Sequence, residues 1–168
     1  MCIRDRLHET NSLVVHCPTA NTFLGSGLFD GGHLGRAERP VGVGVGTDVG
    51  GGTSYSMLST LGESYKVAML RGRKPTAHDL FHLATRGNAM HLGLGDEIGS
   101  IEAGWWADLT VLDPAATPVL ADRHALSEGI EDTLFALAIL GDDRAVRATY
   151  VAGRVAWDAT APAGADSV

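Results

Sequence analysis

The carboxylate of Asp48 is the side chain best placed for chemistry in this 168-residue sequence. It closely follows an apolar run at residues 41–45 (VGVGV), and three glycines, Gly50, Gly51 and Gly52, follow it. In parallel α/β proteins, catalytic groups collect at the carboxyl end of such strands. The glycines leave room for a ligand or a metal beside the carboxylate. The residues alone leave two interpretations equal: a functional carboxylate, or an aspartate that caps the next helix or binds loop amides.

Other polar residues match established catalytic motifs less well. There is no GxGxxG or GxxxxGK[ST] string, so phosphate-loop binding is excluded. His16, at the end of an apolar run, has three open roles: metal ligand, substrate-binding group or packed histidine, of which packing is favoured. His78 and His82 are four residues apart and could grip a metal, but without an HExxH motif surface or packing roles are favoured. Ser54 lacks a GxSxG elbow, and Thr53 or Ser54 is predicted to cap a helix.

The elements that must position Asp48 follow from periodicity. Apolar runs at 13–17 and 41–45 predict two short buried strands, with a short, poorly formed helix between them in 25–40. Because valine and glycine alternate in the second run, one face of that strand is expected to be crowded. Apolar residues at three- and four-residue spacing predict a helix after Thr53, and Thr76 with Asp79 predicts the capped start of another. This order is typical of parallel α/β folds.

The second half of the chain has a different pattern. Residues 98–106 predict a hairpin that leads into a strand at 107–112, residues 127–140 predict a helix closed by Gly141, and residues 146–157 predict a terminal hairpin. Asp142, Asp143 and Arg144 are interpreted as a turn with its own ion pair. The pattern therefore predicts a barrel or an open α/β sheet for about 90 residues and a mostly β appendage for about 60.

Composition excludes several classes of protein. Twenty acidic residues outnumber 13 Lys and Arg residues, and the basic residues form no stripe, so nucleic-acid binding is excluded. No apolar stretch is long enough to cross a membrane. The two cysteines form no CxxC pair, which disfavours a disulfide scaffold or a cysteine zinc site and suits the cytoplasm.

Several strings together resemble guanine deaminases of the amidohydrolase superfamily. They are residues 16–21 (HCPTAN), 23–29 (FLGSGLF), 46–58 (GTDVGGGTSYSML), 63–67 (ESYKV) and 140–144 (LGDDR), in the family's order. The resemblance implies an α/β fold: the C-terminal part of a (β/α)₈ TIM barrel, with its last two strand–helix units, plus part of a small β-sandwich. The implied organisation is a doubtful leader at 1–6, a barrel segment at 7–97, the sandwich's helix and hairpins at 98–158, and a flexible tail at 159–168.

The resemblance also implies an activity, the zinc-dependent hydrolysis of guanine to xanthine and ammonia in purine catabolism. Asp48 matches the family's metal-ligating and proton-transferring aspartate, with Zn²⁺ as the cofactor. The other zinc ligands and the catalytic glutamate match nothing in this sequence, so the chain alone is expected to be inactive. Its two incomplete barrel edges are expected to cause aggregation or oligomerisation.

The expected partner is guanine, with no nucleic acid or membrane, and a homodimer is left open for the intact enzyme. The alternatives are a truncated, non-catalytic amidohydrolase-like chain that serves as a binding or interaction module, another purine-type deaminase of the superfamily, and a degenerate reading frame without function.

Overall fold

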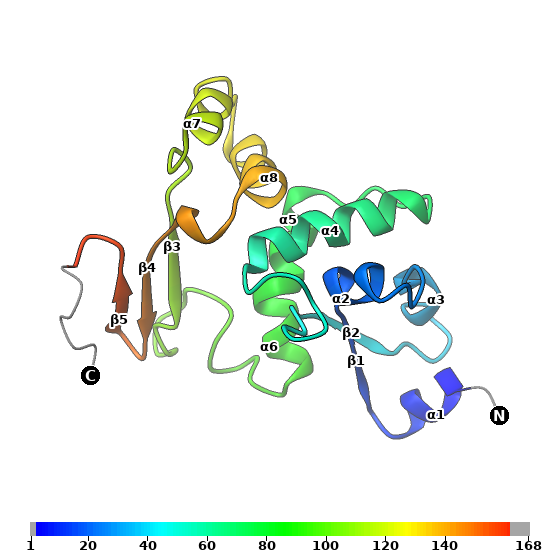
Figure 1. The fold of residues 1–168 in the computed structure, drawn as a ribbon. Coiled ribbons are helices and arrows are strands. Elements are labelled where there is room, and N and C mark those ends of the chain that lie inside the picture. The colour runs from blue at the N-terminus through cyan, green and yellow to red at the C-terminus, as the bar shows by residue number, and fades with distance from the viewer. Residues whose placement is uncertain (1–2, 162–168) are drawn as a thin grey trace.

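A computed structural model of the chain describes residues 3–161. It is a mixed α/β structure in which helices lie between a two-stranded parallel sheet and a three-stranded antiparallel sheet (Figure 1). The elements are α1 (Ile3–Glu9), β1 (Leu13–His16), α2 (Pro18–Phe23), α3 (Gly31–Leu34), β2 (Gly42–Val45), α4 (Met57–Leu70), α5 (Ala77–His82), the π-helical turn η1 (Leu83–Gly87), α6 (Asn88–His91), β3 (Leu109–Leu112), α7 (Pro118–Ala125), α8 (Ile130–Leu140), the 3₁₀ turn η2 (Asp143–Ala145), β4 (Val146–Val151) and β5 (Arg154–Asp158).

The two predicted strands form the parallel pair β1–β2, with His16 opposite Val45. The amide of Gly46 donates to the carbonyl of His16 at 3.1 Å and extends the pairing beyond β2. The expected crowding of β2 is confirmed. A Cβ atom at Gly42 would lie 2.5 Å from the His91 ring, and one at Gly44 would lie 2.6 Å from Oδ1 of Asn88.

The outer edge of β2 is closed at one position by a side chain. The amide of Val45 donates to Oδ1 of Asn88, and Nδ2 of Asn88 donates to the carbonyl of Val45, each at 3.0 Å. Asn88 therefore pairs with Val45 as a neighbouring strand would. Since buried backbone groups need such partners, this contact reduces the exposure of the edge that the sequence led us to expect.

The helix after the glycine loop begins later than predicted. Ser56, not Thr53 or Ser54, is the N-cap of α4, and its side chain accepts a hydrogen bond from the amide of Ser59. Ser54 instead accepts a hydrogen bond from the amide of Ser56 within the loop. The prediction was wrong because Thr53 and Ser54 belong to the loop that leads from β2 to α4. At α5 the predicted capping box between Thr76 and Asp79 is confirmed.

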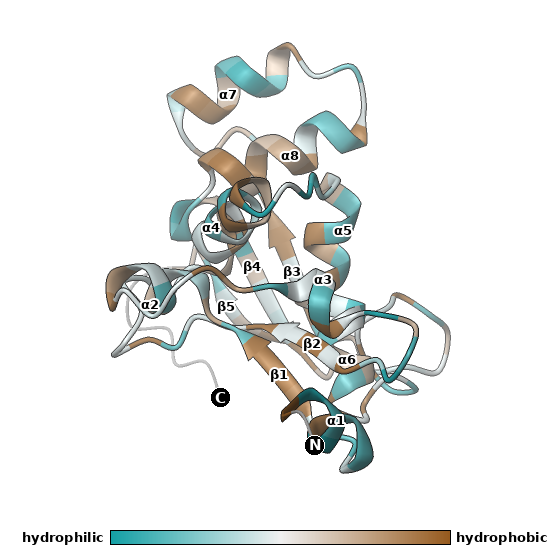
Figure 2. Cartoon of the chain, turned by 90° about the vertical axis from the view of Figure 1, so that its right-hand side faces the viewer, coloured by the Kyte–Doolittle hydropathy of each residue, from teal (hydrophilic) through white to brown (hydrophobic). Residues whose placement is uncertain are grey.

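Helix α4 lies at the centre of the core (Figure 2). Leu61, only 1% exposed, packs with Val45, Leu80 and Ala138 from β2, α5 and α8. Next to it, a Cβ atom at Gly62 would lie 2.8 Å from the carbonyl oxygen of Ala138. Because this neighbour is backbone, the glycine allows α4 and α8 to approach closely.

The C-terminal sheet has the order β3–β4–β5, and the predicted terminal hairpin is confirmed as β4–β5. The predicted ion pair is also present, since the guanidinium of Arg144 donates to the carboxylate of Asp142 at 2.6 Å. Helix α8 begins at Ile130 rather than at residue 127. Helix α7, capped by Thr117 with Pro118 in its first turn, was not predicted.

The predicted hairpin at 98–106 is wrong, because the structure has no strand there. Gly99 and Gly104 each have φ +90°, which interrupts an extended run. The segment is instead an irregular loop. The amide of Trp106 donates to the carbonyl of Glu97 at 2.9 Å, and the guanidinium of Arg86 stacks 4.8 Å from the centre of the Trp105 ring.

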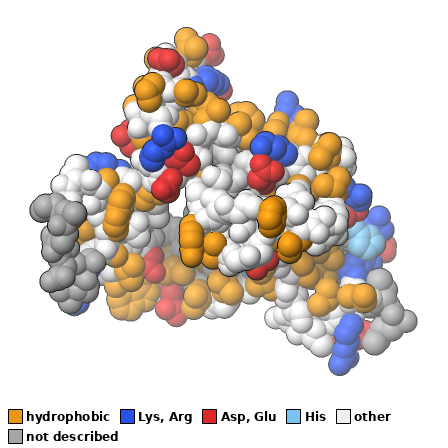
Figure 3. Space-filling model, in the orientation of Figure 1, with side chains coloured by type: hydrophobic (Ala, Val, Ile, Leu, Met, Phe, Trp, Pro, Cys, Tyr) orange, Lys and Arg blue, Asp and Glu red, His pale blue; other side chains and the backbone are white. Residues whose placement is uncertain are grey.

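On the face shown in Figure 3, Lys and Arg side chains are scattered among acidic ones. Within residues 3–161, no helix has both the length and the apolar character that a membrane span requires.

Candidate functional site

Asp48 lies three residues beyond β2, in a tight loop, with φ +48°. Aspartate tolerates this left-handed conformation better than most residues. The loop amides of Gly51 and Gly52 donate to the backbone carbonyl of Asp48, the former at 3.0 Å. With α4 capped by Ser56, the carboxylate of Asp48 serves neither of the structural roles that the sequence left open.

The Asp48 carboxylate is exposed and forms no hydrogen bond or ion pair with residues 3–161. In the loop beside it, glycine is required at position 52 for steric reasons and is favoured at position 50 by a backbone φ of +113°. A Cβ atom at Gly52 would lie 2.0 Å from the carbonyl oxygen of Thr47, whereas one at Gly50 would meet nothing within 4 Å. An exposed, unbonded carboxylate beside open space fits one ligand of a metal ion.

The thiol of Cys17, which directly follows β1, is affected by the charge of Asp48. Burial, and secondly the negative charge of Asp48, raise the pKa of the Cys17 thiol. The Cys17 sulfur lies 3.8 Å from the position of a Cβ atom at Gly46, and Val15 lies at 3.1 Å from the same point. Val15 is 49% exposed, so this face of the β1–β2 sheet is open within the described residues.

His16 turns to the other face of the sheet, where it packs against helix α4. Its side chain is 5% exposed, its Nδ1 forms a 3.4 Å hydrogen bond with the hydroxyl of Ser64, and its ring stacks on Phe29 at 4.4 Å. Nε2 has no hydrogen-bond partner among the described residues. The favoured interpretation of His16 as a packed histidine agrees with this position.

Burial of His16 predicts a pH-dependent stability. Burial lowers the pKa of His16 to about 4, against about 6.5 in an unfolded chain. Between these values the unfolded chain binds more protons, so the free energy of unfolding falls as pH drops from about 6.5 to about 4. One such group contributes a slope of at most about 1.4 kcal/mol per pH unit. Urea unfolding between pH 7 and pH 4.5 should show a shallower decline for His16→Gln than for the unaltered chain.

The matched control is His82→Gln, because the His82 side chain is exposed and forms no hydrogen bond or ion pair with residues 3–161. Its pH profile should run parallel to that of the unaltered chain. Parallel profiles for His16→Gln and the unaltered chain would refute the assignment of this pH dependence to His16.

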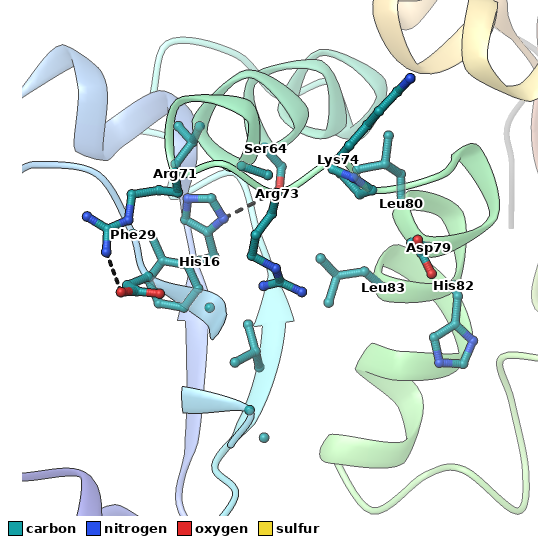
Figure 4. A pocket seen from close by; sticks show the side chains of 18 of the residues that line it. His16, Phe29, Ser64, Arg71, Arg73, Lys74, Asp79, Leu80, His82 and Leu83 are labelled. Carbon is teal, nitrogen blue, oxygen red and sulfur yellow. Dashed lines mark hydrogen bonds and ion pairs between the residues drawn. The ribbon is translucent and has the colours of Figure 1, made fainter. Parts of the chain in front are cut away.

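A cavity of about 490 Å³ opens beside His16, on the helix-covered side of the sheet (Figure 4). Phe29, Val43 and Leu83 line its apolar part, and the Arg73 side chain points into it. Asp48 is not among its lining residues. The cavity is therefore separate from the candidate carboxylate.

A complete metal centre is not present in the described part of the chain. No group of three or more His, Cys, Asp or Glu side chains among residues 3–161 is arranged to hold a metal ion. His78 and His82, the pair considered from their spacing, are both exposed and lie on α5. The Asp48 carboxylate therefore belongs to no such group among the described residues.

Comparison with known proteins was decisive for the family. The profile of the amidohydrolase family matches residues 3–156. The chain belongs to the amidohydrolase family.

Among members of the amidohydrolase family, the guanine deaminase of Escherichia coli K12 is 47% identical to this chain over 155 residues. That alignment covers 92% of the chain and 35% of the E. coli protein. The solved structure of E. coli guanine deaminase matches with a TM-score of 0.86 over 92% of this chain and 36% of that one. An adenosine deaminase from Xanthomonas campestris, with bound zinc, matches at 27% identity and a TM-score of 0.73, over 90% of this chain and 33% of that one.

The chain therefore spans about a third of the length of these amidohydrolase relatives. Its mixed α/β structure matches part of a guanine deaminase structure. The sequence did not single out Thr19, whose hydroxyl contacts the loop of Asp48. Its place in the HCPTAN string, two residues beyond Cys17, was the available signal.

Proposed function

We propose that this chain is the segment of a guanine deaminase that supplies the metal-ligating aspartate, Asp48. The observation that supports this proposal is the unbonded carboxylate of Asp48 at the carboxyl end of β2, in a chain 47% identical to E. coli guanine deaminase. Active sites of (β/α)₈ barrels lie at this end of the strands. Strands β1 and β2, with the helices that follow them, are proposed as the last two barrel units, residues 7–97. Residues 98–158 are proposed as part of a small β-sandwich.

The proposed reaction is guanine plus water giving xanthine plus ammonia. Asp48, with ligands from outside this chain, would hold a zinc ion. A bound zinc ion lowers the pKa of its water ligand to about 7 and so supplies a nucleophile at neutral pH. The carboxylate of Asp48 would accept a proton from the attacking water and would donate it to the departing ammonia. Its exposure and lack of other partners leave it available for this transfer.

A second candidate is a deaminase of another purine. It is supported by the structural match to the zinc-bound adenosine deaminase of X. campestris, which is weaker than the match to E. coli guanine deaminase. A non-catalytic binding module is the remaining alternative. It would need no free carboxylate at the strand end.

The experiment is a graft. Residues 7–157 replace the matching segment of E. coli guanine deaminase, which gives a complete protein called here the grafted enzyme. Purified with zinc, it should convert guanine to xanthine and ammonia, with little activity on adenosine. The isolated 168-residue chain, assayed in parallel, should release no ammonia.

A soluble, zinc-containing grafted enzyme without activity on any purine would contradict the deaminase proposal and favour the binding module. Preference for adenosine over guanine would favour the second candidate. The ungrafted E. coli enzyme serves as the positive control.

A further inference from the structure

Thr19 joins the two loops at the carboxyl ends of β1 and β2. It lies in the first turn of α2, immediately after β1, and is only 4% exposed. Its hydroxyl donates a hydrogen bond to the carbonyl of Thr47 at 3.2 Å. Thr47 is the residue before Asp48, so the contact reaches the candidate carboxylate through one peptide unit.

This bond extends the strand pairing beyond its last backbone contact. The amide of Gly46 donates to the carbonyl of His16, and the Thr19 hydroxyl then binds the carbonyl of the next residue, Thr47. Beyond that point no backbone hydrogen bond from the β1 side is present among the described residues to hold the loop. The side chain of Thr19 thus supplies one further hydrogen bond between the two chain segments.

The loop held by Thr19 is under geometric constraint. Asp48 has φ +48°, and Gly52 folds back so closely that a Cβ atom there would lie 2.0 Å from the carbonyl oxygen of Thr47 and 2.8 Å from Oγ1 of Thr19. Residues in uncommon backbone conformations persist when surrounding contacts fix them. The three groups, Thr19, Thr47 and Gly52, therefore pack as one unit around the peptide that precedes Asp48.

We infer that Thr19 is a positioning residue, whose hydroxyl fixes the direction of the Asp48 carboxylate by holding the carbonyl of Thr47. The effect of Thr19 on catalysis rests on the proposed function, whereas its effect on the structure of the Asp48 loop does not. A misplacement of a catalytic group by about 1 Å can cost about 100-fold in rate. The Thr19 side chain thus affects the reaction rate without contacting the substrate.

The first test uses the 168-residue chain itself and does not depend on activity. Hydrogen exchange of peptides covering residues 47–56, measured by mass spectrometry, reports the amides of Gly51 and Gly52 that donate to the carbonyl of Asp48. Thr19→Val, which keeps the shape and removes the hydroxyl, should accelerate exchange there about tenfold, as expected from the loss of one hydrogen bond. Thr19→Ser should restore slow exchange.

The matched control is Thr22→Val. The Thr22 hydroxyl donates to the backbone carbonyls of Pro18 at 2.8 Å and Thr19 at 3.4 Å, both within the same helix, and forms no hydrogen bond with residues 47–56. Exchange at residues 47–56 should be unchanged in this variant. Equal exchange in Thr19→Val and the unaltered chain would overturn the positioning role. Faster exchange throughout the chain would do the same, because it would mean that Thr19 only supports the general fold.

The second test places the same substitutions in the grafted enzyme. Thr19→Val should lower kcat for guanine about 10- to 100-fold with KM within about twofold, and Thr19→Ser should recover most of kcat. A raised KM with unchanged kcat would overturn the catalytic consequence. If the grafted enzyme is inactive but the exchange results hold, the proposed function fails and the positioning of Asp48 by Thr19 stands.

Discussion

Replacing Asp48 with asparagine in the grafted enzyme is expected to lower kcat/KM for guanine by at least about 10³-fold. Asparagine has nearly the same shape but cannot accept a proton, and general acid–base groups typically contribute about 10²–10⁴-fold. Loss of a charged metal ligand adds to this effect. Release of ammonia, followed together with xanthine formation, measures the change.

The control for Asp48→Asn is Asp96→Asn, which makes the same chemical change at another exposed aspartate. Asp96 lies in the loop after α6 and has no hydrogen bond or ion pair with residues 3–161. Its substitution should leave kcat/KM within about twofold. An Asp48→Asn enzyme that retains more than a tenth of the activity would remove Asp48 from proton transfer.

The second large effect is expected on stability, at Leu61. Leu61→Ala should lower the free energy of unfolding of the 168-residue chain by about 2–5 kcal/mol. The Leu61 side chain is 1% exposed and packs against residues of β2, α5 and α8, so its truncation leaves a cavity where three elements meet. Urea unfolding followed by circular dichroism measures the loss.

Leu70→Ala makes the identical truncation in the last turn of α4, where the side chain is 72% exposed. It should change the free energy of unfolding by no more than about 0.5 kcal/mol. Comparable losses at both positions would mean that α4 does not have the buried face that the structure assigns to it.

Local sequence signals predicted the elements that rest on neighbouring residues. The capping box of Thr76 and Asp79 needs only four residues, and the terminal hairpin of β4 and β5 needs only its own turn, so both were predictable. The irregular loop at 98–106 was not predictable from neighbouring residues. Its path depends on a stacking contact between Trp105 and Arg86, which lies 19 residues earlier and on another element.

The candidate site shows the same division between local and distant causes. Asp48 stood out because an acidic residue between an apolar strand and three glycines is a local pattern. Thr19 did not, because its hydrogen bond to Thr47 spans 28 residues and follows from the parallel pairing of β1 with β2. No short turn joins these two parallel strands, so local turn residues do not fix which of their residues lie opposite one another.

We propose that Asp48 is one ligand of a metal centre that other chain segments complete. Zinc titration, by isothermal calorimetry, of the 168-residue chain and of the grafted enzyme tests this claim most directly. We expect no saturable zinc binding at micromolar concentrations for the chain alone, and about one zinc ion per grafted enzyme. Tight one-to-one binding of zinc by the 168-residue chain, lost in Asp48→Asn, would contradict it, because the ligands would then all lie within this chain.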